Sequence, residues 1–338
     1  MFRDLYKQSA KNRADMQEER RKKLLEEQKQ KRQLLQDVQR NVDFRQSRQK
    51  AKYNKFPAKT TNFRTLKDAY DCDYSLQLSE WLRERPENLD DWFMMPCPKG
   101  QRCLLMASNG RTDMYNKAGR KRMSFNTLLP GDNGNGKQTN TLLDCVYSNV
   151  QDTFYVLDAL VYGNQELIHC ETQFRFFWLR SKFAECEELS NRSQYNEKPL
   201  KLLERYDFEN FADVSEVLQR FPIWPENEPE LDGLLFYHKE ASYTCGSTPL
   251  VGWLFAFMVS DVLGIKVNEN YEKPENYVAP LPYMEDFDVA LDNQKLKRKQ
   301  RKQISKDMDT EDSLCTNNEF YKTIDWEIEN SSILSVHE

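Results

Sequence analysis

The chain has 338 residues and a formal net charge of −5 at pH 7, with 39% hydrophobic and 30% charged residues. This length fits one large domain or two ordinary ones and is enough to bury a sizeable core. No apolar run approaches the roughly 18–20 residues that cross a bilayer, and the first residues lack the apolar segment of a secretory signal. We therefore expect neither a secreted nor an integral membrane protein.

The cysteines and histidines are too scattered for a common metal site. Eight cysteines are spread along the chain, no CxxC motif occurs, and only three histidines are present. The usual zinc sites need these residue types at short spacing. We expect a reduced intracellular protein with no metal ion and no cofactor.

The charge is divided unevenly along the chain. Residues 1–55 hold 17 Lys and Arg against 8 Asp and Glu, so this arm carries +9 and the remaining chain carries −14. Such halves usually have different partners. We divide the chain into an arm (1–55), a linker (56–72), a folded domain (73–287) and a basic, then acidic, mostly disordered tail (288–338).

The arm from residue 17 to about residue 52 lacks Gly and Pro and is rich in helix-forming residues. Its apolar stripe is thin, so a coiled coil is not expected, and so polar a helix gains little from packing on its own domain. We expect it to become helical when an acidic surface neutralises it. A solvated helical tail and a docking helix for a protein or an RNA are both open. The cations concerned are Arg20, Arg21, Lys22, Lys23, Lys29, Lys31 and Arg32.

The folded domain is predicted to be α+β. Short runs rich in β-branched or aromatic residues and bounded by Gly, Asn or Pro are typical of strands. Because strands outnumber helices and follow one another in hairpin order, we expect antiparallel sheets with flanking helices. Asp213 is a candidate helix cap. The predicted strands are 102–107, 141–147, 153–162, 233–238 and 250–254, and the predicted helices are 174–183 and 214–221.

Three segments occur in an order that resembles the superfamily of mRNA capping enzymes and DNA ligases. They are CPKGQR (97–102), the strands TLLDCVY and TFYVLDALVY, and DGLLFYHK (232–239) followed by LVGWL (250–254). The family motif KxDGxR supplies a nucleophilic lysine, because an amine forms the phosphoramidate intermediate. Here Cys97 stands in place of that lysine, while Gly100 and Arg102 remain. The resemblance implies a scaffold that binds a guanine nucleotide without transferring it.

A more specific resemblance extends over about residues 1–270. LSEWL (78–82), CPKGQR, QFRFFW (173–178) and above all DGLLFYHKEASYTCGSTPLVGWL (232–254) resemble the snurportin family of nuclear import adaptors. The arm resembles an importin-β-binding segment, to which Arg3, Tyr6 and Lys7 of RDLYK also belong. The resemblance implies that the domain holds the 2,2,7-trimethylguanosine cap of small nuclear RNAs.

The resemblance also implies the residues of the cap site. A 7-methylated guanine is a flat cation that stacks well on an indole, and Trp253 is the implied platform. Leu78, Ser79 and Trp81 are the implied apolar wall beside the methylated amine. Arg102 and Lys117 are the implied cations for the triphosphate, the first as a fork and the second as a point charge. The alternative for each residue is that it binds no ligand and is only a core side chain or a surface charge.

These observations predict a non-enzymatic import adaptor, with the cap in the domain, importin-β on the arm and an exportin for recycling. Such a protein would shuttle between nucleus and cytoplasm. Two alternatives stay open: an active RNA guanylyltransferase that uses Lys99 or Lys117, and a general RNA-binding protein that uses its basic arm. No membrane partner is expected.

Overall fold

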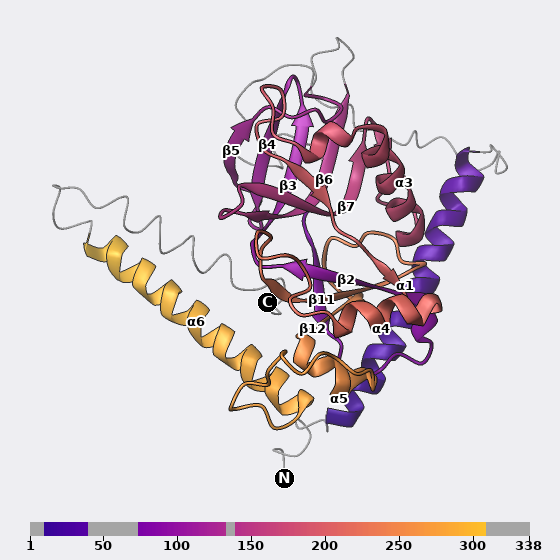
Figure 1. Ribbon diagram of the computed structural model, residues 1–338, viewed down its shortest axis with the longest axis vertical. Helices are drawn as coiled ribbons and strands as arrows, with labels where there is room; N and C mark the ends of the chain where they lie inside the picture. Colours follow the sequence, from indigo (N-terminus) through magenta and orange to yellow (C-terminus); the bar gives the residue numbers. More distant parts are fainter. Residues whose placement is uncertain (1–9, 40–73, 133–138, 309–338) are drawn as a thin grey trace.

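A computed structural model describes residues 10–39, 74–132 and 139–308 of the chain. Two β-sheets form the body, and helices cover their outer faces and one side (Figure 1). The predicted linker and the arm residues Arg3, Tyr6 and Lys7 lie outside the described residues. None of the described helices is long and apolar enough to cross a membrane.

The first sheet has five strands in the order β1-β12-β11-β2-β10. Its pairs are antiparallel except for β1 with β12, where a register shift between Ser79 and Glu80 marks a bulge. Along β2, Pro96 and Pro98 pair with β11 but lie beyond the two residues that pair with β10, so on the β10 side their missing N–H groups cost no ladder bond. The strands are β1 (Gln77–Trp81), β2 (Trp92–Pro98), β10 (Tyr206–Asp207), β11 (Leu231–His238) and β12 (Gly246–Leu254).

The second sheet is ordered β5-β4-β3-β6-β7-β8, with the short strand β9 parallel to β7. Its remaining pairs are antiparallel and join strands that are consecutive in the chain, except for β3 with β6, which β4 and β5 separate along the sequence. The strands are β3 (Gln101–Ser108), β4 (Arg111–Asn116), β5 (Lys121–Phe125), β6 (Asn140–Ser148), β7 (Thr153–Tyr162), β8 (Gln165–Glu166) and β9 (Leu200–Leu202).

The helices lie outside the two sheets (Figure 1). Phe176 of α3 packs on Phe93 and Tyr237 of the five-stranded sheet, and Leu179 and Phe183 of the same helix pack in the core of the seven-stranded sheet. One helix therefore ties both sheets together. The helices are α1 (Ala10–Gln39), α3 (Thr172–Glu185), α4 (Phe211–Gln219), α5 (Val259–Leu263) and α6 (Pro280–Met308), with 3-10 turns at Leu89–Asp91, Glu187–Ser190, Phe208–Asn210 and Ala256–Met258.

The predicted α+β class, with antiparallel sheets and flanking helices, is confirmed, and each predicted strand and helix of the domain coincides with an observed one. The expected hairpin between 141–147 and 153–162 is the β6–β7 pair. The proposed helix cap is wrong: α4 begins at Phe211, so Asp213 lies in its first turn, where its carboxylate accepts a hydrogen bond from the Asn210 side chain.

Two buried ion pairs lie between the sheets. Arg102 of β3 binds Asp144 of β6, and Arg175 of α3 binds Asp158 of β7, with all four side chains at most 2% exposed. Asp144 and Asp158 face each other across the β6–β7 ladder. Breaking either pair would leave a charge unpaired in the core, so these contacts fix how the sheets and α3 fit together.

The basic arm docks on the folded domain as the helix α1, which runs along one side of the body from α5 towards α3 (Figure 1). Its cations find acidic partners on the domain: Arg20 binds Glu80, Lys22 binds Glu87 and Arg32 binds Glu171. We expected so polar a helix to gain little from its own domain. The difference arises because the domain supplies the acidic surface itself.

The predicted boundary between domain and tail at residue 287 falls inside α6, which continues without a break to Met308. Its first turns are fixed by side chains that the sequence did not mark as core: Met284 is fully buried, and Phe287 packs against Trp81 and Phe255. Further along, Val289 and Leu296 are exposed, and the helix projects away from the body (Figure 1).

Candidate functional site

The candidate site begins where the chain crosses from one sheet to the other. The turn between β2 and β3 contains Lys99 and Gly100, so residues 97–102 border both sheets. A β-carbon on Gly100 would lie 2.6 Å from the Tyr147 carbonyl oxygen and from a methyl group of Val146. Only glycine lets this turn lie so close to β6.

Cys97 lies at the end of β2, paired with Gly233 of β11. Its side chain is fully buried, and burial raises the pKa of the thiol well above its usual range. A thiol in such surroundings stays protonated and is a poor nucleophile. The position at which the sequence resemblance would place a reactive lysine therefore holds a buried thiol.

Arg102 is an internal residue. Its Nε and Nη2 atoms donate to the two carboxylate oxygens of Asp144 at 2.6 and 2.7 Å, and Tyr243 donates to the same carboxylate at 2.8 Å. Burial alone would lower the pKa of Arg102, but Asp144 outweighs it and raises the pKa. The two guanidinium N–H groups that the resemblance assigns to phosphate thus bind Asp144. Of the Arg102 side-chain nitrogens, only Nη1 has no hydrogen-bond partner among the described residues.

Trp253 lies across β11 rather than at an open cleft edge. A β-carbon on Gly233 would be 2.3 Å from Cζ2 of the indole, so the glycine of the DGLLF segment makes room for the ring. The tryptophan is 1% exposed, and its Nε1 atom has no partner among the described residues. A base can stack on this ring only after a neighbouring group moves away.

Trp81 pairs with Trp253 in the β1–β12 register. Unlike Trp253, it is anchored, because its Nε1 atom donates to Asp288 of α6 at 2.8 Å. Leu78 is half-buried against a core cluster that includes Leu76, while Ser79 is buried. The three residues implied as the apolar wall therefore all come from one strand, and Trp81 belongs to a different part of the core from Leu78.

Lys117 lies in the exposed turn between β4 and β5. Burial raises the pKa of Asp232, at the start of β11, to about 6, and the charges of Lys99 and Lys117 oppose that rise. Both lysines are therefore near this carboxylate and near the turn that contains Cys97. Lys99 also forms an exposed ion pair with Glu230 at 2.5 Å.

Five of the seven buried side-chain atoms without a hydrogen-bond partner, counted over the described residues, belong to four strands of this region. Arg102 also bonds to the Gln77 backbone and its charge acts on the Tyr237 hydroxyl, so β1, β3 and β11 meet at one place. Buried polar atoms are normally satisfied, and a group of exceptions indicates a site for water or a ligand. The five are Gln77 Oε1, Ser79 Oγ, Arg102 Nη1, Tyr237 OH and Trp253 Nε1.

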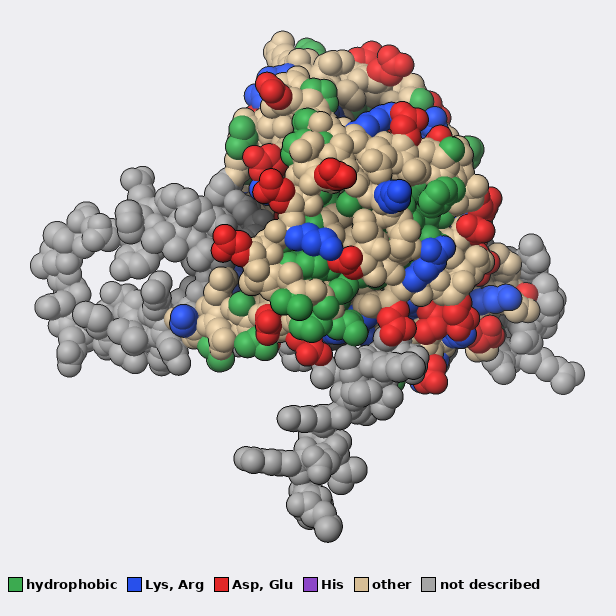
Figure 2. Space-filling model, turned by 60° about the horizontal axis from the view of Figure 1, so that its bottom comes forward, with side chains coloured by type: hydrophobic (Ala, Val, Ile, Leu, Met, Phe, Trp, Pro, Cys, Tyr) green, Lys and Arg blue, Asp and Glu red, His purple; other side chains and the backbone are tan. Residues whose placement is uncertain are grey.

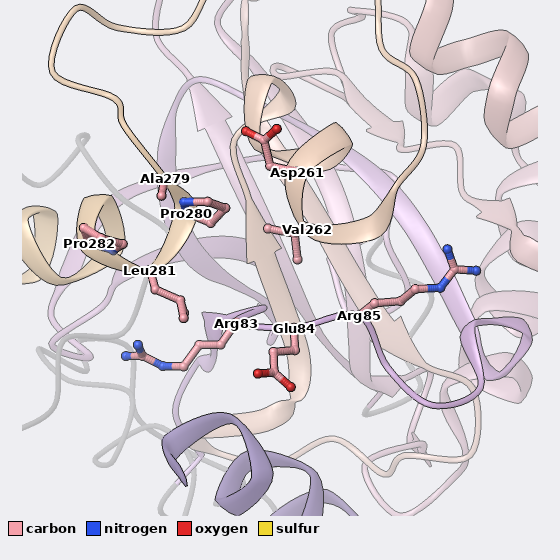
Figure 3. A pocket seen from close by; sticks show the side chains of 9 residues that line it. All are labelled: Arg83, Glu84, Arg85, Asp261, Val262, Ala279, Pro280, Leu281 and Pro282. Atoms are coloured by element: carbon pink, nitrogen blue, oxygen red, sulfur yellow. The ribbon is translucent and has the colours of Figure 1, made fainter. Parts of the chain in front are cut away.

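A separate hollow of about 330 Å³ lies at the far end of β1 (Figure 3). It is lined by residues 83–85, two residues of α5, and residues 279–282 at the start of α6, and it contains none of the implied cap residues. Its lining contains two arginines and two carboxylates, so the charges of these side chains cancel. Such a lining does not favour a phosphate, and no group of three or more potential metal ligands occurs in the described part of the chain.

The comparison with protein families decides which group this domain belongs to. The family described as the Snurportin1 m3G cap-binding domain matches residues 75–256, which is more than half of the chain. The chain belongs to this family. The domain is a cap-binding domain, and the helices α1, α5 and α6 lie outside the match.

Solved structures similar to this chain include DNA ligases. The ligase domain of LigD from M. tuberculosis has 13% identity and a TM-score of 0.35 over 53% of this chain and 58% of that one. A mycobacterial DNA ligase D complexed with ATP and MES has 12% and 0.34 over 53% and 59%. Chlorella virus DNA ligase-adenylate has 10% and 0.33 over 53% and 66%. The chain thus spans less than two thirds of each.

Proposed function

We propose that this protein is a nuclear import adaptor that holds the 2,2,7-trimethylguanosine cap of spliceosomal small nuclear RNAs and links the ribonucleoprotein to importin-β. The observation that carries the proposal is the group of unpaired buried polar atoms on β1, β3, β11 and β12, Trp253 Nε1 among them, inside a snurportin-type cap-binding domain. In the free protein the site is closed. The cap would enter by displacing whatever covers the indole.

The chemistry of the cap matches the groups in this region. The methylated guanine is cationic and stacks on the indole face of Trp253, a contact worth roughly 1–3 kcal/mol. The two N2 methyl groups remove the donors that a carboxylate would bind in an ordinary cap. Selectivity for the trimethylated form would then come from apolar contact with the strand that contains Leu78, Ser79 and Trp81.

The phosphate bridge requires positive charge at the mouth of the site. Lys117 supplies it as an exposed cation, with Lys99 nearby. Arg102 contributes at most its one unpaired N–H group, because Asp144 holds the rest of the guanidinium. On the face shown in Figure 2, basic and acidic side chains are intermixed, which disfavours a general RNA-coating surface.

We propose no enzymatic activity for this protein. The thiol of Cys97 cannot form the phosphoramidate that nucleotidyl transfer requires, and Lys99 points to an exposed partner, Glu230. The alternative, an active guanylyltransferase using Lys99 or Lys117, is tested by incubation with labelled GTP and magnesium. We expect no acid-labile protein adduct, and a stoichiometric adduct would establish the enzyme.

The arm would bind importin-β with the cations that now contact the domain. Arg20, Arg21 and Arg32 face the body, and Arg21 is buried over the Trp92 ring, whereas Lys23, Lys29 and Lys31 are exposed. A carrier would therefore have to release α1 from Glu80 and Glu171 before it could bind the whole arm. Return of the empty protein by an exportin, and residence in both nucleus and cytoplasm, belong to this proposal.

Binding of two cap dinucleotides to the full chain tests the cap proposal. We expect the trimethylated dinucleotide to bind more tightly than the monomethylated one, and deletion of residues 1–55 should leave this preference intact. Loss of all cap binding on that deletion would favour the general RNA-binding alternative.

A second experiment tests the arm. Glu80→Ala should increase capture of the chain by importin-β, because it removes the carboxylate that binds Arg20 and leaves Gln17 only its bond to the Trp81 carbonyl. Glu87→Ala, which removes only the exposed contact to Lys22, is the matched control. Equal capture of both variants and the wild type would contradict competition between domain and carrier.

A further inference from the structure

The start of α6 is an integral part of the aromatic cluster around Trp81. The Trp81 ring lies 5.4 Å from Phe287 and 5.7 Å from Phe255, and Phe255 lies 6.3 Å from Trp253. Tyr283 packs on Phe257 one turn earlier. The helix thus forms a wall of the region that contains both tryptophans, although it lies beyond residue 256, where the family match ends.

One polar contact fixes this wall to β1. The Trp81 Nε1 atom donates to Asp288 Oδ1 at 2.8 Å, between residues 207 positions apart in the sequence. The other carboxylate oxygen lies 3.9 Å from the Arg83 guanidinium. In Figure 3, Arg83 extends towards the start of α6 while Arg85 points the opposite way, and Arg85 donates to the Leu263 carbonyl instead.

The two indoles differ in how they are held. Trp253 has an unpaired Nε1 atom in the described structure, whereas the ring plane of Trp81 is set by a carboxylate. A hydrogen bond to a charged acceptor is stronger than a neutral one, and it draws electron density onto the indole ring. A negative charge at this position also favours a cationic base nearby.

We propose that Asp288 is a positioning residue for the cap site, which holds Trp81 in the orientation needed against the methylated base and adds negative charge beside that cation. The inference rests on the proposed cap function. It extends the recognition site to α6, a helix that the family match does not include.

The test uses the full chain and a double-mutant cycle. Asp288→Ala should weaken binding of a trimethylated cap dinucleotide about tenfold to 150-fold, the range for loss of one hydrogen bond to a charged group. Asp288→Asn keeps an acceptor and should recover part of the loss. Asp286→Ala, at an exposed carboxylate on the same helix, should bind like the wild type.

Trp81→Phe distinguishes positioning from general destabilisation, because it keeps a ring but removes the N–H donor. In this background Asp288→Ala should cause a clearly smaller loss of affinity than in the wild type, because only the contribution of its charge remains to be removed. Two outcomes would overturn this inference but leave the cap function standing. One is an equal loss of affinity in both backgrounds. The other is that Asp288→Ala binds the cap as Asp286→Ala does, while the wild type binds it. A wild-type chain that binds neither cap dinucleotide would overturn the cap function and this inference with it.

Discussion

The indole of Trp253 lies directly across the backbone of Gly233, so closely that a β-carbon at position 233 would be 2.3 Å from Cζ2 of the ring. This contact explains why a glycine stands near the start of β11, just before the large residues Leu234 to Tyr237. It also defines which face of the indole is available, because β11 covers the other. A base that stacks on Trp253 must approach from the side opposite Gly233.

Gly233→Ala should displace the indole and lower both stability and cap affinity. Overpacking of this kind costs about 1–3 kcal/mol of unfolding free energy. Gly252→Ala is the control, because its β-carbon would meet the Leu82 side chain at 3.1 Å, which can adjust. Urea denaturation and cap titration measure both effects, and equal behaviour of the two variants would contradict the role of Gly233.

Arg102→Met should destabilise the domain in the absence of any cap. Removing one partner leaves Asp144 buried without its counter-ion, a loss of about 3–5 kcal/mol. Lys182→Ala, which breaks the surface pair with Glu185, should change stability by less than about 1 kcal/mol. Should Arg102→Met keep the wild-type denaturation midpoint, the arginine would be a ligand-binding residue rather than a structural one.

Lys117→Ala should weaken cap binding and reduce its salt dependence. Loss of one phosphate contact lowers the slope of log affinity against log salt by about 1. Lys266→Ala, at an exposed lysine whose carbonyl bonds to α4, is the control. Titrations at several salt concentrations check this prediction, and an unchanged slope would remove Lys117 from the phosphate site.

Asp232→Asn should alter how stability depends on pH. The pKa of Asp232 is about 6 in the folded state and about 3.9 in an unfolded chain. Between these values the folded state binds more protons, so the carboxyl group makes stability fall as pH rises through this window. The difference in unfolding free energy, Asn variant minus wild type, should therefore be more positive at pH 7 than at pH 4.

Glu230→Gln is the control for the same experiment, because the pKa of Glu230 is lowered whereas that of Asp232 is raised. The Lys99 side chain lowers the pKa of Glu230, so its charge contributes stability that is present at pH 7 and lost in acid. The Gln variant should be slightly less stable than the wild type at pH 7 and equal to it in acid. A pH dependence for Asp232→Asn that matches the wild type would refute the raised pKa.

Strand patterns with clear boundaries were predictable from the sequence, and others were not. The run 153–162 predicts β7 to the residue, because it is long, apolar and bounded by polar turns. β2 was missed because two prolines interrupt it, and they are tolerated only where β10 stops pairing. That edge is set by a strand more than 100 residues away, so no local pattern reveals it.

The candidate site shows the same division. The family resemblance assigned Trp253, Trp81 and Arg102 to one site, and this assignment stays a prediction. No sequence motif revealed that the Arg102 guanidinium donates to Asp144, or that α1 docks on the domain through Glu80. Nor did any motif reveal that the Trp81 indole donates to Asp288. These are pairings between charges or polar groups 42 to 207 residues apart, whose partners only the folded chain selects.

The most direct test of the account is a crystal structure of the full chain with a trimethylated cap dinucleotide. We predict that the methylated base stacks on Trp253, on the face opposite Gly233 and at van der Waals distance, about 3.5 Å. We further predict that Trp81 lines the side of the base with the two N2 methyl groups. A base bound elsewhere, with the Trp253 ring still sealed between the sheets, would contradict this account.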